Sequence, residues 1–214
     1  MIEILDPSKI KILDGYERYG KGWHYILDYS WINNKLSSYL ETHKAKTLLD
    51  AGCGKFGFHK YLGQKFNLVT YGLDRKDFST VDFVGTFLNL FNSLPNFDII
   101  IWISSIEHNS KEDMKFCYEK SIELLNPKGL FLATFPISKQ TFWQDIPVFQ
   151  QNLSPKDASL VFDSVVENET SFDKIHSDYF LYYDMETKYK KRFGTNLDSS
   201  DPRYLTAGVL KIKD

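Results

Sequence analysis

The residues best suited to chemistry form a glycine-rich turn, from Asp50 to Gly57, between a predicted strand and a predicted helix. Its glycines have the spacing G-x-G-x-x-G, at positions 52, 54 and 57, which allows a tight turn and a close approach of backbone to ligand. A second acid, Asp74, follows 20 residues after Gly54 at the end of the next predicted strand, where a carboxylate can bind ribose hydroxyls. The pattern therefore predicts a nucleotide-type cofactor site.

The charge of Asp50 separates the two classes of cofactor that fit this turn, nicotinamide dinucleotides and S-adenosylmethionine. A dinucleotide brings a pyrophosphate, and two like charges about 4 Å apart repel by about 4 kcal/mol at an effective dielectric constant near 20. S-adenosylmethionine brings a sulfonium, an ammonium and no phosphate. Asp50 therefore favours S-adenosylmethionine, with a nicotinamide-dependent oxidoreductase as the alternative.

Four segments of the chain resemble motifs of the class I S-adenosylmethionine-dependent methyltransferases. They occur in the same order along the chain as in that family. They are Asp50-x-Gly52-x-Gly54-x-x-Gly57, Gly72-Leu73-Asp74-Arg75, Phe97-Asp98-Ile99-Ile100 with Ser104-Ser105-Ile106-Glu107-His108, and Leu124-Leu125-Asn126-Pro127-Lys128-Gly129. The resemblance covers about residues 30–136 and the last ten residues. It implies a cofactor site formed by Asp50, Ala51, Gly52, Cys53, Gly54, Gly57, Asp74, Arg75, Thr86, Phe87 and Ser104.

One departure from the family concerns adenine recognition. The family often has an acid after the third strand, whereas this chain has Gly85-Thr86-Phe87-Leu88 there. The Thr86 hydroxyl or backbone groups are the expected substitutes.

The resemblance implies transfer of a methyl group to a small polar acceptor, and we expect an oxygen of a sugar or another small metabolite. His108 and Glu107 follow the carboxyl end of the fourth strand, where ligands bind in open α/β sheets. His108 is a candidate base, with a structural loop histidine as the alternative. His24 is a third catalytic candidate.

Two aromatic regions are candidates for contact with the acceptor. Residues 16–31 are either a lid, with Tyr19, His24 and Tyr25 facing the acceptor, or a helix packed on the sheet. In the second region, residues 137–204, His176 and Tyr179 are the candidates, although such residues also fill cores.

The elements that must position these residues alternate between strand and helix. Strands are predicted at 46–50, 68–74, 81–84, 97–103, 129–135, 160–166 and 205–213, and helices at 31–41, at 57–64 and after Ser110. This order predicts an α/β fold, a Rossmann-like, mostly parallel sheet with helices on both faces and an antiparallel terminal strand. We expect a single domain, with an aromatic cap over 1–30, a cofactor-binding core over 31–136 and a decorated part over 137–214.

Composition narrows the class of protein. The 214 residues are 43% hydrophobic and 25% charged, as expected for one globular domain. A net charge of −2 disfavours a nucleic-acid partner. The lack of a long apolar run disfavours a membrane, and the lack of metal-ligand spacings disfavours a metal. We therefore expect a cytoplasmic protein with a small-molecule acceptor. A non-catalytic binding protein is the second alternative, and the pattern does not predict an oligomeric state.

Overall fold

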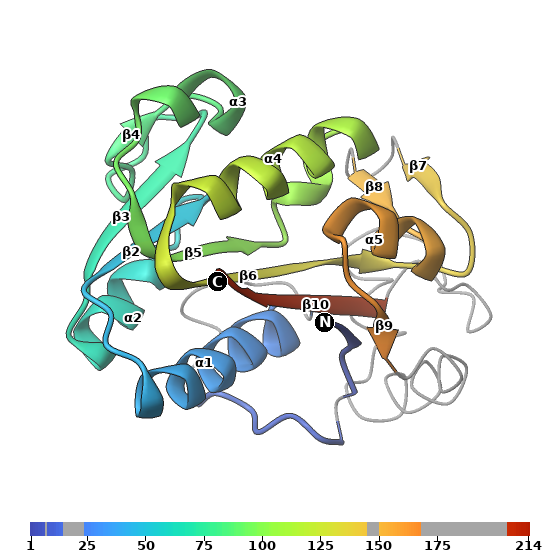
Figure 1. Ribbon diagram of the computed structural model, residues 1–214, viewed down its shortest axis with the longest axis horizontal. Helices are drawn as coiled ribbons and strands as arrows, with labels where there is room; N and C mark the ends of the chain where they lie inside the picture. Colours follow the sequence, from blue (N-terminus) through green and yellow to red (C-terminus); the bar gives the residue numbers. More distant parts are fainter. Residues whose placement is uncertain (7, 15–23, 145–149, 168–204) are drawn as a thin grey trace.

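An eight-stranded sheet forms the centre of the fold, with the strand order β4-β3-β2-β5-β6-β10-β1-β9 (Figure 1). The computed structural model describes residues 1–6, 8–14, 24–144, 150–167 and 205–214. The strands are β1 (Ile2–Ile4), β2 (Thr47–Ala51), β3 (Val69–Asp74), β4 (Phe83–Val84), β5 (Phe97–Ile103), β6 (Leu125–Ile137), β9 (Val166–Glu167) and β10 (Leu205–Ile212). A small second sheet pairs β7 (Phe142–Gln144) with β8 (Gln150–Asn152).

Helices cover both faces of the main sheet. Helices α1 (His24–Thr42) and α2 (Phe58–Phe66) lie on one face, and α4 (Lys111–Leu124) and α5 (Pro155–Phe162) lie on the other (Figure 1). The short helices are α3 (Phe87–Leu90), η2 (Phe91–Ser93) and η3 (Ile106–His108). Strand β5 reads FDIIIWI, a continuous apolar run, because a strand covered on both faces needs apolar side chains on both.

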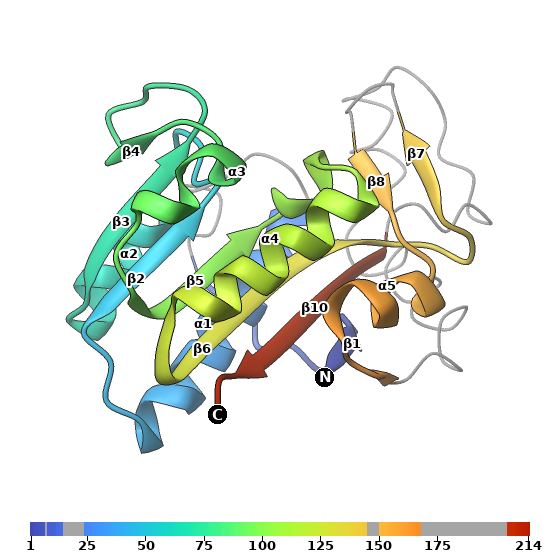
Figure 2. The same ribbon diagram turned by 45° about the horizontal axis from the view of Figure 1, so that its top comes forward.

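The strand directions confirm the predicted fold class. Strands β4, β3, β2, β5 and β6 pair in parallel, whereas β10 is antiparallel to β6. Figure 2 shows β10 beside β6 with its arrow reversed, and β1 near it. The predicted helix start at Ser110 is also confirmed, since its hydroxyl accepts a hydrogen bond from the amide of Asp113 at 3.1 Å.

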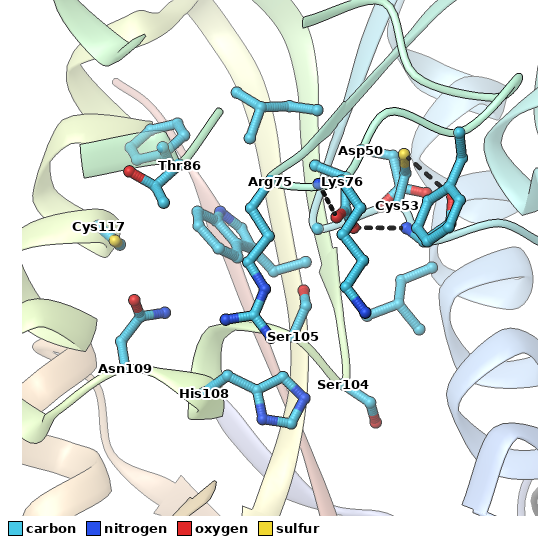
Figure 3. A pocket seen from close by; sticks show the side chains of 18 of the residues that line it. Asp50, Cys53, Arg75, Lys76, Thr86, Ser104, Ser105, His108, Asn109 and Cys117 are labelled. Atoms are coloured by element: carbon cyan, nitrogen blue, oxygen red, sulfur yellow. Dashed lines mark hydrogen bonds between the residues drawn. The ribbon is translucent and has the colours of Figure 1, made fainter. Parts of the chain in front are cut away.

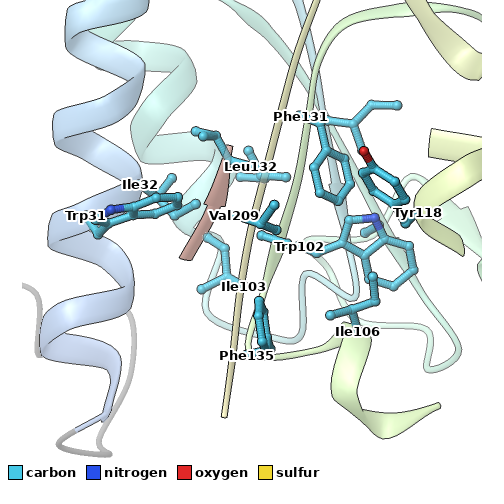
Figure 4. Close-up of a cluster of buried hydrophobic side chains, with 14 of the residues drawn as sticks. Trp31, Ile32, Trp102, Ile103, Ile106, Tyr118, Phe131, Leu132, Phe135 and Val209 are labelled. Carbon is cyan, nitrogen blue, oxygen red and sulfur yellow. The ribbon is translucent and has the colours of Figure 1, made fainter. Parts of the chain in front are cut away.

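The N-terminal part is integrated into the sheet and core. Strand β1 lies inside the sheet, and α1 runs across the expected boundary between residues 30 and 31. Trp31 packs flat on Gly208 of β10, where an added Cβ would stand 2.6 Å from the indole ring. Figure 4 shows Trp31 and Ile32 on one side of the sheet, with Trp102 on the other. Of the aromatic segment, Tyr29 and Trp31 are therefore packed residues.

The strand predicted at 160–166 is wrong. Helix α5 occupies Pro155–Phe162, and strand β9 begins only at Val166. Ser154 caps α5 by accepting from the Asp157 amide at 3.2 Å, and Pro155 takes a first-turn position where its missing N–H costs nothing. In the described part of the chain, no helix is both long enough and apolar enough to cross a membrane.

Candidate functional site

A cavity of about 360 Å³ opens at the carboxyl ends of β2, β3 and β5 (Figure 3). This edge of a parallel sheet is where open α/β folds bind their ligands. Of the residues predicted from the sequence, those that line the cavity are Asp50, Gly52, Cys53, Gly54, Asp74, Arg75, Thr86, Phe87, Ser104 and His108. The fold thus brings segments that are far apart in the sequence to one cavity.

The glycine turn after β2 needs its glycines for two different reasons. Gly52 has φ 79°, and an added Cβ there would lie 2.5 Å from the Cβ of Ser105. Ser105 itself donates a hydrogen bond to the Ala51 carbonyl at 2.8 Å, which holds the end of β5 against the turn. Gly54 has φ 56°, but an added Cβ would meet nothing within 4 Å. Gly52 therefore permits close packing, and Gly54 leaves open space.

Asp74 joins the end of β3 to the glycine turn. Its Oδ2 accepts from the Gly54 amide at 3.0 Å, and its Oδ1 accepts from the Lys76 amide at 2.9 Å. Each oxygen has a further lone pair, so the carboxylate can still accept bonds from ligand hydroxyls. The hydrogen bond to Gly54 also fixes the distance between the acid and the turn.

Asp50 is a buried carboxylate, 2% exposed, at the end of β2. Its Oδ2 lies 3.4 Å from Nδ1 of His59 on α2, which is within ion-pair range when the imidazole is protonated. No described residue donates a hydrogen bond to Asp50 Oδ1. A buried acceptor left open beside a cavity fits a ligand that brings a donor or a positive charge.

Cys53, in the same turn, is not suited to act as a nucleophile. Burial, reinforced by the nearby charges of Asp50 and Asp74, raises the pKa of its thiol. The thiol is therefore neutral at physiological pH, and Cys53 contributes small size and polarity.

The opposite wall of the cavity is largely apolar. Phe87 meets Trp102 edge to face, with ring centroids 5.1 Å apart, and Cys117 lies beside them. Burial raises the pKa of the Cys117 thiol to about 12, so it too is neutral. Thr86 precedes α3 without a side-chain capping bond, which leaves its hydroxyl available to the cavity. This wall suits a flat, mainly apolar ring.

The segment after β5 forms the third wall of the cavity. It contains two catalytic candidates, His108 and Glu107, which lie in different environments. His108 is exposed and lines the cavity, as Figure 3 shows. Glu107 is 3% exposed and does not line the cavity. Burial raises the pKa of Glu107 to about 8. Only His108 of this pair therefore faces the cavity directly.

Ser104 connects this wall to a buried acid that the sequence analysis missed. Its hydroxyl donates a hydrogen bond of 2.7 Å to Oδ2 of Asp28, which is fully buried on α1. Burial, helped by the nearby charge of Glu107, raises the pKa of Asp28 to about 8, although hydrogen bonds with Ser104 and Thr134 act to lower it. The visible signal was an acid inside the aromatic stretch Leu27-Asp28-Tyr29.

Several predicted residues lie elsewhere. Ala51 is fully buried within β2, and Gly57 immediately precedes α2; neither lines the cavity. His24 and Tyr25 begin α1, but their side chains lie outside what the structure describes. Tyr19, His176 and Tyr179 lie outside the described residues altogether.

Other residues line the cavity without having been predicted to do so. They are Tyr29, Phe56, Phe58, Lys76, Phe78, Trp102, Ser105 and Asn109, together with Cys117 and several aliphatic or glycine positions. Ser105 lies inside the segment Ser104-Ser105-Ile106-Glu107-His108, and Asn109 follows it directly, so the position of both in or beside that motif was the available signal. The aromatic members are indistinguishable from core residues in a sequence.

The sheet order, the glycine turn and the cavity together define the fold of S-adenosylmethionine-dependent methyltransferases, and comparison with solved structures bears this out. The chain is similar to a proposed sarcosine dimethylglycine methyltransferase from Galdieria sulphuraria, with a TM-score of 0.58 and 14% identity over 89% of this chain and 86% of that one. It is also similar to the 1,6-didemethyltoxoflavin-N1-methyltransferase of Burkholderia thailandensis, determined with S-adenosylhomocysteine, with a TM-score of 0.55 and 11% identity over 87% and 78% of the chains.

The same fold also occurs in the 4+2 cyclase SpnF, with a TM-score of 0.54 and 13% identity over 90% of this chain and 82% of that one. No family model matches the chain, and no curated protein matches it. The resemblance read from the sequence is therefore confirmed as a likeness of fold. Because one fold can carry different chemistry, the activity has to be argued from the site.

Proposed function

We propose that the protein transfers a methyl group from S-adenosylmethionine to a small polar acceptor. The observation that carries this proposal is the cavity, where Asp50, the glycine turn and Asp74 meet at the carboxyl ends of three parallel strands. The neighbouring structures support it through the fold that they share with this chain.

The described residues fit this cofactor. In this proposal Asp74 accepts bonds from the ribose hydroxyls, and Thr86, Phe87 and Trp102 enclose the adenine. The polar end of the cofactor lies against the turn, where Asp50 has a buried oxygen without a described partner. The remaining cofactor contacts that we propose are Gly52, Cys53, Gly54, Arg75 and Ser104, all of which line the cavity. When bound, S-adenosylmethionine supplies an electrophilic methyl group on a positively charged sulfur.

The protein's own part in the reaction is to orient the acceptor, exclude water and take up a proton. His108 is the base that we propose for a hydroxyl acceptor, because its side chain lies on the cavity wall and Glu107 does not. An oxygen of a sugar or another small metabolite remains the acceptor expected from the sequence. Among the described residues, no cluster of three or more histidine, cysteine or acidic side chains could hold a metal ion.

The first experiment is thermal unfolding of the purified protein with S-adenosylmethionine, S-adenosylhomocysteine, NAD or NADP. A ligand at 100 times its dissociation constant stabilises a protein by about 2.7 kcal/mol, which raises the melting temperature measurably. We expect a rise with the two adenosyl compounds alone. A rise with a nicotinamide cofactor alone would move the protein to the oxidoreductases. A rise without methyl transfer to any compound of a broad acceptor screen would favour a non-catalytic binding protein.

Asp74→Ala is the matched test of the cofactor site. The variant removes the proposed ribose contact and the link to Gly54, so we expect the affinity for S-adenosylhomocysteine to fall by at least about tenfold. Asp77→Asn changes an exposed acid in the same loop and serves as the control. Equal affinities of the Asp74 variant and the wild type, measured by calorimetry, would contradict the proposed orientation of the cofactor.

A further inference from the structure

Two buried carboxyl groups lie behind the third wall of the cavity without a full set of partners. The exposed fraction is 0% for Asp28 of α1 and 3% for Glu107 of η3. No hydrogen bond from the described residues reaches Oδ1 of Asp28 or Oε2 of Glu107. Burying such oxygens without partners costs free energy, so their retention calls for a group that satisfies them.

Ser104 connects Asp28 of this pair to the cavity. Its hydroxyl proton points to Asp28 in the 2.7 Å hydrogen bond, so the lone pairs of its Oγ remain able to accept a bond. Its amide donates to both the carbonyl and the hydroxyl of Thr134, each at 3.2 Å, and its φ of 45° lies in the left-handed region. This backbone conformation, unusual for a serine, is thus held in place by β6.

No described basic side chain balances the negative charge that either acid would carry when ionised. Neither acid forms an ion pair within the described ranges, and no basic residue of those ranges is among the groups that shift the pKa of either acid. Burial favours their neutral forms, whereas a nearby cation would favour ionisation. An ammonium group that donates to Ser104 Oγ would extend the existing bond to Asp28 and would offset the cost of a buried negative charge.

We propose that Asp28, presented through Ser104 and with the Glu107 carboxyl near it, forms a subsite for an alkylammonium group bound in the cavity. The inference rests on the proposed function, because it assumes that the cavity holds an adenosyl compound. The ammonium can come from two sources: the amino-acid part of the cofactor, or an amine of the acceptor placed beside the transferred methyl group. The chemistry recognised is the same in both cases.

Three adenosine compounds separate these two sources in calorimetric titrations. 5′-Methylthioadenosine has no ammonium, S-adenosylhomocysteine has the amino-acid ammonium, and sinefungin has in addition an amine at the position of the reactive centre. The ratio of the first two affinities reports the cofactor ammonium. The ratio of the last two reports an ammonium beside the transferred group, as an acceptor amine would place it.

In Asp28→Asn we expect one of these two ratios to fall by about tenfold, which is the size of one charge-assisted hydrogen bond. The ratio that falls identifies the source of the ammonium. If both ratios change by less than about fivefold, the subsite does not exist. If the wild type binds none of the three compounds, the proposed function itself is refuted, so the two failures remain distinguishable.

Two further variants and a control make the result specific. Ser104→Ala keeps both carboxyls but removes the link to the cavity, so we expect the same ratio to fall, and this variant carries the test if Asp28→Asn does not fold. Glu107→Gln should lower the same ratio by a smaller factor. Glu112→Gln removes an exposed acid of α4 and should leave both ratios unchanged. An equal fall in the Glu112 variant would assign the effect to net charge and overturn the proposal.

Discussion

Gly52 illustrates how one residue links local conformation to the shape of the site. Its φ of 79° disfavours any residue with a Cβ, and Ser105 occupies the space that the Cβ would need. We expect Gly52→Ala to lower the free energy of unfolding by about 2–4 kcal/mol, because backbone strain and a steric overlap combine. Urea denaturation measures this loss.

Gly54→Ala is the natural comparison for that substitution. Its φ of 56° is also in the left-handed region, but the added methyl group meets no atom within 4 Å. Only the strain of a left-handed backbone with a Cβ remains, so we expect Gly54→Ala to lower the free energy of unfolding by about 1–2 kcal/mol. Equal losses at the two positions would show that close packing of Ser105 against the turn does not contribute to stability.

At the scale of single residues, the sequence predicted the groups whose roles are local. The turn, Asp74 and the segment after β5 each combine suitable residue types with short spacing, and the structure places them around one cavity. For Asp28 the sequence offered only an acid among apolar and aromatic residues, and nothing local pointed to its hydrogen-bond partner Ser104, which is 76 positions away in the chain. Only the packing of α1 against the sheet brings the two together.

At the scale of elements, the N-cap of α4 tests whether a nearby side chain stabilises the start of a helix as the sequence predicts. The Ser110 hydroxyl accepts from the Asp113 amide at 3.1 Å and donates to the Asp113 carboxylate at 2.9 Å. Ser110→Ala leaves that amide without its partner, and we expect a loss of about 1 kcal/mol in the free energy of unfolding. Glu112 is an exposed residue of the first turn of α4 and serves as the control. Glu112→Ala should change the free energy of unfolding by less than about 0.5 kcal/mol. Equal effects would mean that the cap is not formed in solution.

Helix α5 shows why one element escaped prediction. The apolar run of residues 160–162 is compatible with either a buried strand or a short helix, and periodicity cannot decide over so few residues. The deciding signals stood upstream, where Ser154, Pro155 and Asp157 form a helix start. Strand β1 was missed for a related reason, since three residues define no pattern and its pairing with β10 spans almost the whole chain.

At the scale of the whole molecule, the buried acids predict how stability depends on pH. Burial raises the pKa of both Asp28 and Glu107 to about 8, whereas in the unfolded chain such groups titrate near 4. Between these values the folded state holds protons that the unfolded state releases. The free energy of unfolding therefore falls as the pH rises from about 5 to 8, by up to about 1.4 kcal/mol per pH unit for each group, and this fall ends above pH 8.

Asp98 has a lowered pKa, so it makes the free energy of unfolding fall as the pH becomes acidic. It therefore limits stability on the acid side of the range from about pH 5 to 8. Burial alone would raise its pKa, but hydrogen bonds from Asn126, Lys46 and Thr47 outweigh burial and lower it. Its contribution is fully present above the unfolded pKa near 4 and is lost as the pH falls through the lower folded value. Maximum stability is therefore expected on the acid side of neutrality, near the lower end of the window set by Asp28 and Glu107.

Asp28→Asn isolates one of the two buried acids in this pH profile. The amide cannot ionise, so between pH 5 and 8 the slope should become shallower by about 1.4 kcal/mol per pH unit, and at pH 8 the variant should be more stable than the wild type. Urea denaturation at several pH values and constant ionic strength measures both quantities. An unchanged slope would mean that Asp28 already loses its proton near pH 4 in the folded protein. In that case its carboxylate must be balanced in solution, and a ligand ammonium would not be needed to stabilise its charge.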